Sequence, residues 1–306
     1  MVKQTPDSGR RVVTLLPKRE KVNRSKAEKI IIWTVFVFLV VYAITLIYPF
    51  FYLLINSAKT TFDYWKHPLS LPTEFGPFLE NYKYVFTEMN VNGKGIPFMF
   101  LNSVVLSVLQ TVVSMSLSCM AAYVLAKYKF RGNAFIYTVT IIASVAPTVG
   151  AAPATYKLML GLNFIDSSYF YNLLGMLFMV GAFGGPFLYL HSFFKAIPWS
   201  YGESAQLDGA SDFRIFLQIM VPLAANGILT FTIMRFLGSW NEYWTNYLYF
   251  GSYPTLAVGI SLLSKESGKD AELFAAMIVS IIPVLTFYAI FQRQLMRNTI
   301  GGGLKG

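Results

Sequence analysis

Six long runs of the sequence carry no charged side chain, and this feature constrains the fold more than any other. Each run is as long as the roughly 20 residues that a helix needs to cross the hydrocarbon core of a bilayer. Backbone groups in lipid must be paired within a helix or a closed barrel, and the ten-residue alternation typical of barrel strands is missing. We therefore predict an all-α polytopic membrane protein with six transmembrane helices. The runs are residues 30–58, 95–126, 132–156, 167–194, 215–234 and 273–292.

The composition supports a membrane protein. Hydrophobic residues make up 55% of the chain and charged residues 13%, whereas about a quarter of a soluble domain is charged. The first run is too long for the apolar core of a signal peptide, so it is predicted to be a retained span. The single cysteine, Cys119, excludes a disulfide within the chain and any metal site built on cysteines, and no metal site is predicted.

The runs predict three regions along the chain. A basic N-terminal tail covers residues 1–29, the six-helix domain covers 30–293, and a Gly-rich tail covers 294–306. The third span should be interrupted by Pro147, Gly150 and Pro153, because proline and glycine break helices. The predicted spans are residues 30–56, 98–125, 133–156, 168–193, 215–240 and 272–293.

The distribution of positive charge predicts the orientation. With the N-terminus inside, 17 Lys and Arg residues fall on the cytoplasmic side, nine of them in residues 1–29, against seven outside. The positive-inside rule then places both termini in the cytoplasm, in a multi-pass protein of a bacterial cytoplasmic membrane. The net charge of +10 is accordingly assigned to orientation and lipid headgroups, and not to nucleic acid.

The segment between the fourth and fifth spans, residues 195–214, is too polar to enter lipid. Ser200 is a candidate N-cap of a short helix that runs to about Leu207, and Gly209 permits a turn. Asp208 or Ser211 is a candidate cap of a second short helix. The segment predicts a cytoplasmic helix–turn–helix that presents Glu203, Ala205 and Leu207 to a partner; the alternative is an amphipathic connector on the membrane surface.

This segment resembles the EAA motif of the permease subunits of binding-protein-dependent ABC importers. Glu203-Ser204-Ala205, Gly209 and the later Ile219-Met220-Val221-Pro222 correspond to the motif, with Ser204 in place of an alanine. The resemblance implies a type I importer fold in which this loop, the coupling helix, contacts the ATPase subunits. The implied coupling residues are Glu203, Ser204, Ala205, Leu207, Asp208, Gly209, Ala210 and Phe213.

Two further segments resemble the carbohydrate permeases of this family, the subfamily of the maltose permease G subunit. They are residues 236–244, which contain Gly238-Ser239-Trp240-Asn241-Glu242, and the ending Gly303-Leu304-Lys305-Gly306. In this family such a tail can reach the ATPase interface; the alternative is a flexible end.

A charged residue within a span usually faces a bundle interior or water. Arg235 lies directly after an uncharged run, and the residues that follow it offer hydrogen bonds and aromatic faces suited to a sugar ring. Two roles remain open for Arg235, a contact with cargo or a structural pairing inside the bundle. The candidate substrate pathway is Arg235, Trp240, Asn241, Glu242 and Tyr243.

The chain has no phosphate-binding Gly-x-x-x-x-Gly-Lys-Ser/Thr motif and no catalytic motif, so it is predicted to be a transport subunit without its own ATPase. The resemblance implies a second homologous permease, two ATP-binding cassette subunits that hold ATP and Mg²⁺, and an extracytoplasmic solute-binding protein. The expected cargo is a sugar or oligosaccharide, moved into the cytoplasm by alternating access. The alternatives are another polar solute such as a glycerol-phosphate compound, a secondary transporter, or a membrane-embedded enzyme.

Overall fold

The structure is a computed structural model, and it describes residues 25–146, 150–165, 167–265 and 268–301. Helices form nearly all of the described secondary structure. Most of the predicted basic tail, the last five residues of the Gly-rich tail, and Pro147 lie outside the described residues.

The first helix, α1 (Lys26–Asn56), begins four residues before the predicted span. Ser25 and Glu28 form a reciprocal capping box at its start: Ser25 N donates to Glu28 Oε2 (3.0 Å), and Glu28 N donates to Ser25 Oγ (3.2 Å). Large apolar side chains such as Trp33 and Leu39 are exposed all around the helix. A helix that is apolar on every side and unburied requires lipid or another apolar partner around it.

The segment after α1 folds into α2 (Thr61–Lys66), α3 (Gly76–Thr87) and a hairpin of β1 (Asn90–Val91) with β2 (Lys94–Gly95). The turn of the hairpin is Asn92-Gly93, a strong hairpin signal. Lys59, which is 1% exposed, donates from Nζ to His67 O (2.8 Å). The backbone carbonyl of Lys59 accepts from Asn81 Nδ2 (2.7 Å). Lys59 therefore joins the end of α2 to α3.

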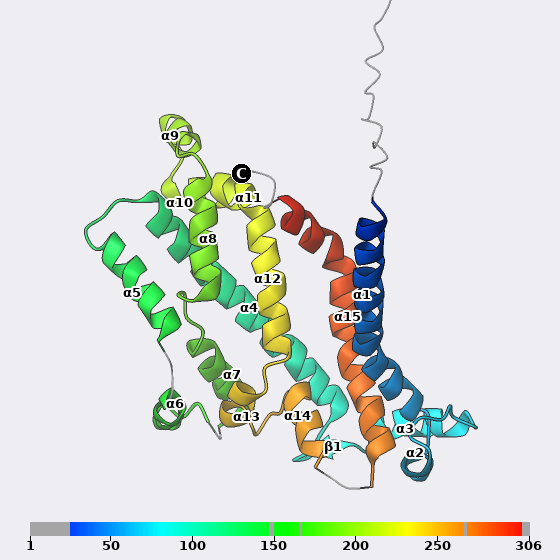
Figure 1. The fold of residues 1–306 in the computed structure, drawn as a ribbon. Helices are drawn as coiled ribbons and strands as arrows, with labels where there is room; N and C mark the ends of the chain where they lie inside the picture. Colours follow the sequence, from blue (N-terminus) through cyan, green and yellow to red (C-terminus); the bar gives the residue numbers. More distant parts are fainter. Residues whose placement is uncertain (1–24, 147–149, 166, 266–267, 302–306) are drawn as a thin grey trace, which may run out of the picture. The chain divides into compact units, whose positions relative to one another are not determined.

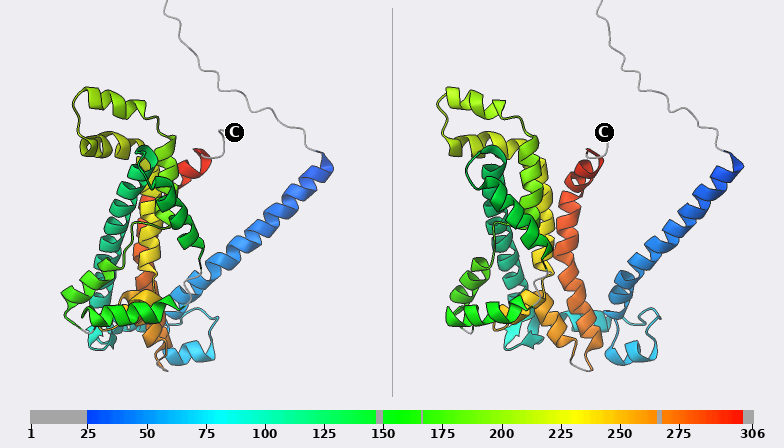
Figure 2. Two further views of the ribbon diagram at one scale, coloured as in Figure 1. Left: turned by 90° about the vertical axis from the view of Figure 1, so that its left-hand side faces the viewer. Right: turned by 60° about the vertical axis from the view of Figure 1, so that its left-hand side comes forward.

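Helix α4 (Ile96–Lys127) is the central helix, packed against α8 (Gly185–Ala196) and α12 (Ala225–Trp240). The three helices run alongside one another (Figures 1 and 2). Small side chains let helix backbones approach closely in lipid. The buried face of α4 is rich in them: Ser103, Ser107, Thr111, Ser114, Ser118 and Ala122.

Two of the predicted spans are split into shorter helices. The third consists of α5 (Asn133–Val145) and α6 (Ala151–Gly161), and the predicted interruption near Gly150 is present. The fourth consists of α7 (Tyr169–Phe178) and α8, so the prediction of one continuous helix over 168–193 is wrong. Pro186 explains where α8 starts, since a proline without N–H fits only the first turn of a helix.

The predicted continuous helix over 215–240 is also wrong. The chain passes through α10 (Asp212–Ile215), the π-helical turn η1 (Phe216–Met220) and α11 (Val221–Leu223), and then bends by 80° at Ala224 into α12. Pro222 lacks the N–H that a regular helix needs there, and π turns and prolines are the usual causes of sharp bends.

After α12 come α13 (Trp244–Tyr249), α14 (Leu256–Leu263) and α15 (Asp270–Gly301). Helix α15 continues eight residues beyond the predicted end of the sixth span. In the unit formed by residues 52–306, α9 (Ser200–Leu207) and α10 lie at one end of the bundle, and α6, α13 and α14 lie at the other (Figure 1).

Among the described residues, three continuous helices are long and apolar enough to cross a membrane: α1, α4 and the part of α15 up to Arg293. The bent pair around Ala224 makes a fourth candidate span. The two remaining predicted spans are the split pairs α5–α6 and α7–α8. The six uncharged runs are therefore all helical, and three of them are interrupted.

Candidate functional site

Helices α9 and α10 form the helix–turn–helix that the sequence predicts. Ser211 caps α10, its Oγ accepting from Arg214 N (3.4 Å), as one of the two predicted alternatives requires. The predicted cap at Ser200 is wrong, because Trp199 takes the N-cap position of α9 and makes no side-chain cap. Between the helices, Gly209 has φ of +80°, a backbone conformation that favours glycine.

The two faces of α9 differ in exposure. Glu203 is exposed and Leu207 is 89% exposed. Ala205 is only 9% exposed, so the prediction that it points outward is wrong. It lies three residues after Gly202, on the face packed against the hydrophobic core, where an ideal Cβ on Gly202 would lie 2.7 Å from the Trp199 ring.

The remaining residues of the predicted coupling loop divide in the same way. Ala210 is half-buried and packs against the core cluster that contains Ala205. Phe213 is 64% exposed, beside Phe216. We call the exposed set the α9–α10 surface; it consists of Glu203, Ser204, Leu207, Asp208 and Phe213.

Tyr128, at the end of α4, ties this surface to the central helix. Its ring contacts Trp199 edge-on, with centroids 5.9 Å apart, and its hydroxyl bonds to that of Tyr123 (3.2 Å). Burial raises the pKa of Tyr128, and hydrogen bonds with Tyr123 and Asp212 raise this pKa further. The phenol therefore stays protonated and remains available as a donor to Asp212.

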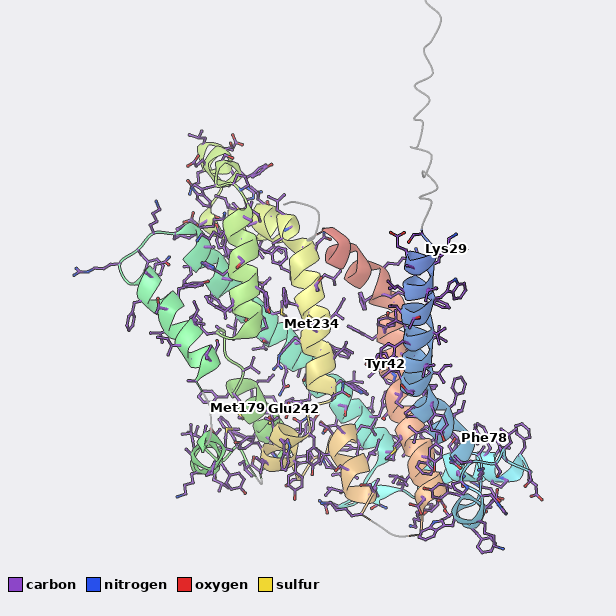
Figure 3. The ribbon with its side chains drawn as sticks, in the orientation of Figure 1. Lys29, Tyr42, Phe78, Met179, Met234 and Glu242 are labelled. Carbon is purple, nitrogen blue, oxygen red and sulfur yellow. The ribbon has the colours of Figure 1, made fainter. Side chains whose placement is uncertain are left out.

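A polar cavity of about 380 Å³ lies between α4, α12 and the connection from α7 to α8. We call it the polar cavity. Its polar side chains are Gln110, Ser114, Ser118, Arg235, Glu242 and Thr245, and its apolar ones include Met176, Met179 and Phe183. Glu242 and Met179, which are labelled in Figure 3, both line it.

The predicted pathway residues fall into two groups. Arg235 and Glu242 both line the polar cavity. Trp240 is 4% exposed and packs on Phe236 and Phe100 in an apolar cluster. Asn241 is exposed and bonds within its own helix, and Tyr243 stacks on Tyr247, so the structure does not bring these three side chains to the cavity.

Glu242 has two interactions at the cavity wall. Its Oε1 accepts from Thr245 N (3.0 Å) at the start of α13, and its charge attracts that of Arg235. In the part of the chain that the structure describes, no hydrogen bond or direct ion pair engages the Arg235 guanidinium. The two opposite charges therefore face one cavity without closing on each other.

Four polar lining residues were missed as site residues from the sequence: Gln110, Ser114, Ser118 and Thr245. Ser114 and Ser118 give no clear signal of a cavity in the sequence, because small side chains in a membrane helix equally favour close helix packing. Gln110 is the most informative, since a primary amide inside an uncharged run is costly in lipid and usually has a partner. Here Ser239 Oγ donates to Gln110 Oε1 (2.6 Å, buried), which links α4 to α12.

The wall opposite α4 is the non-helical connection between α7 and α8, whose Met179, Val180, Gly181, Phe183 and Gly184 line the cavity. One carbonyl of this connection, Ala182 O, accepts from Ser118 Oγ (2.8 Å). Irregular backbone at membrane depth is tolerated where it lines a cavity or is buried in protein. Broken helices of this kind mark the substrate sites of many transporters.

No group of three or more His, Cys, Asp or Glu residues in the described ranges is arranged to hold a metal ion.

Apolar helices, a short exposed helical pair at one end and a polar cavity between broken helices define a membrane transport subunit. The chain belongs to the family of binding-protein-dependent transport system inner membrane components, which matches residues 114–300.

Similar proteins include the diacetylchitobiose uptake system permease of Streptomyces coelicolor, 31% identical over 271 residues that cover 86% of each chain. The arabinooligosaccharide transport system permease of Bacillus subtilis is 28% identical, covering 88% of this chain and 94% of its own. A solved bacterial ABC transporter chain involved in alginate import has the same fold, with a TM-score of 0.74 at 22% identity, over 88% of this chain and 98% of its own.

Proposed function

We propose that this chain is a permease subunit of an ATP-driven importer that moves a sugar or oligosaccharide into the cytoplasm. Relatives named for diacetylchitobiose, starch degradation products and arabinooligosaccharides support a saccharide cargo. A relative named for sulfoquinovosyl glycerol, 30% identical, favours a second candidate, a smaller polar glycoside.

The observation that carries this proposal is the α9–α10 surface. A compact pair of helices exposes the carboxylates of Glu203 and Asp208, and two large apolar side chains, Leu207 and Phe213, away from the bundle. An exposed apolar side chain beside a charge is suited to a groove in a partner protein. The occupants we propose are two ATPase subunits, one on this chain and one on a second, homologous permease.

The orientation follows from the same proposal. The α9–α10 surface faces the cytoplasm together with both termini, and the end that carries α13 and α14 receives cargo from an extracytoplasmic binding protein. ATP and Mg²⁺ are bound by the ATPase subunits. Their closure moves α9 and α10, and the permeases alternate as rigid bodies between outward and inward access.

The test is co-purification of the ATPase from cells that express the whole transporter. Leu207→Asp should remove the ATPase from the purified complex and abolish uptake. The matched control is Leu71→Asp, at a leucine that is 71% exposed in the connection between α2 and α3. Retention of the ATPase and of uptake by the Leu207 variant would contradict the proposal.

A further inference from the structure

The polar cavity contains one positive and one negative side chain, and this balance bears on the charge of its ligand. Arg235 and Glu242 are the two ionisable residues among the described lining residues. Their opposite charges interact, yet the guanidinium has no direct ion pair in the described structure. The space between them is therefore open to groups that accept a hydrogen bond from Arg235 and donate one to Glu242. A sugar hydroxyl does both.

The floor of the cavity holds a third hydrogen-bonding group. Gln110 is only 6% exposed, and its Oε1 is occupied by Ser239 Oγ at 2.6 Å. This bond leaves the amide N–H groups of Gln110 as the donors toward the cavity that it lines. Ser239 itself is 3% exposed, so it fixes the orientation of Gln110 from behind.

The opposite wall supplies apolar contact. Phe183 lines the cavity in the connection between α7 and α8, and its ring meets that of Phe187 edge-on at 5.1 Å. An aromatic ring and two methionines face the polar side chains across the cavity, a combination that suits the apolar C–H face and the hydroxyl edge of a pyranose. The volume of 380 Å³ lies at the small end of the range of about 300–1,000 Å³ for ligand sites, so the cavity fits a short saccharide and not a polymer.

We infer that the polar cavity is a saccharide site selective for neutral over acidic sugars, with Arg235 and Glu242 as its specificity-determining pair. The inference rests on the proposed function and deepens it. Arg235 alone would favour a sugar carboxylate. Glu242 cancels that preference, because its charge repels an acidic ligand at the same place and because burying an unmatched charge is costly.

The experiment measures binding of two radiolabelled disaccharides, diacetylchitobiose and a mannuronate disaccharide, to the purified complete transporter without its binding protein. The unmodified protein should bind the neutral disaccharide at least tenfold more tightly. Glu242→Gln should shift the neutral-to-acidic affinity ratio at least tenfold toward the acidic sugar. The amide of this variant keeps an oxygen to accept from Thr245 N, so the start of α13 is preserved.

A double variant in which the cavity again has no net charge distinguishes a change of selectivity from damage to the fold. Arg235→Gln combined with Glu242→Gln removes both charges and should return the ratio to that of the unmodified protein. Ser239→Ala, which releases Gln110, should weaken both sugars by the same factor. Met234→Ala alters an exposed neighbour on α12 outside the cavity and should change neither affinity (Figure 3).

Three outcomes would overturn the inference: no binding of either disaccharide to the unmodified transporter, no preference for the neutral one, or a ratio that Glu242→Gln leaves unchanged. Uptake assays with the binding protein present test the proposed function separately. If the transporter imports saccharides but gives any of these outcomes, the proposed function stands and the inference about the polar cavity is wrong. A transporter that imports no saccharide loses the proposed function itself.

Discussion

Adding a single methyl group at Gly202 should disturb the position of α9, which we propose as the ATPase contact, more than it disturbs the stability of the protein. An ideal Cβ at this position lies 2.7 Å from Cζ3 of Trp199 and 2.9 Å from Cε3 and Cη2, where ordinary contact begins at 3.4 Å. The indole or the helix must therefore move by roughly 0.7 Å. Crowding of this kind costs about 1–3 kcal/mol, and the better helix propensity of alanine returns about 0.8–1.0 kcal/mol.

The net cost of Gly202→Ala is then between roughly zero and 2 kcal/mol, too little to unfold most proteins. Its effect should appear as displacement of Trp199, which contacts Tyr128 at the end of α4. We expect cargo-stimulated ATPase activity to fall several-fold while the amount of assembled complex changes little. The assay compares ATPase activity in proteoliposomes, with and without cargo-loaded binding protein, and the melting temperature of the same samples.

Gly76→Ala is the matched control, because Gly76 is exposed on α3, away from the α9–α10 surface, and an added Cβ there meets no atom within 4 Å. A second control relieves the crowding: Trp199→Leu combined with Gly202→Ala should recover part of the lost coupling. Unchanged coupling in Gly202→Ala, or equal losses in Gly76→Ala, would refute the argument that close packing of Trp199 on Gly202 positions α9.

Three further predictions concern other parts of the chain. Gly209→Val should reduce coupling and lower the melting temperature, because the left-handed conformation of this position costs a branched residue about 1–2 kcal/mol or more. Gly209→Asn should be tolerated, and equal behaviour of the two variants in uptake assays would contradict this prediction. Lys59→Ala should lower the melting temperature by removing the bond from the buried Lys59 Nζ to His67 O, a bond from a charged group worth about 1.5–3 kcal/mol, whereas Lys265→Ala, at an exposed lysine, should have no effect. In intact cells an impermeant maleimide should label Lys265→Cys but not Leu207→Cys, which should react only after the membrane is opened; labelling of the latter from outside would reverse the proposed orientation.

The sequence was sufficient to predict the class of fold, because a lack of charge over 20 residues has one common physical explanation. It could not predict how the helices are broken. Pro222 was identified as part of a motif, yet nothing in its neighbours indicated the π turn of η1 or the 80° bend at Ala224. Helix ends in lipid depend on whether neighbouring side chains can satisfy the freed backbone groups. The hydrogen bond from Ser118 to Ala182, 64 residues apart, is such a contact.

In the candidate site, too, the sequence predicted some residues correctly and could not predict others. Arg235 and Glu242 were identified because charge near a span is costly, and the structure places both in the polar cavity. Trp240 has the chemistry of a sugar-stacking residue, but its burial against Phe236 and Phe100 depends on how α12 is rotated. Ala205 and Glu203 are neighbours in one motif and lie on opposite faces of α9, so residues of one motif need not share a role.

The bend at Ala224 links the orientation of α12 to that of the segment before it. Helices α10 and α11 with η1 between them form one arm, and α12 forms the other, at 80° to it. When the bend stays rigid, rotation of the segment 212–223 about its own axis displaces α12 sideways, because α12 lies at 80° to that axis. Helix α12 carries Arg235, which lines the polar cavity, and Ser239, which holds the cavity residue Gln110 from behind. A small turn at the α9–α10 surface would thereby change the width of the cavity without any stretching of the chain.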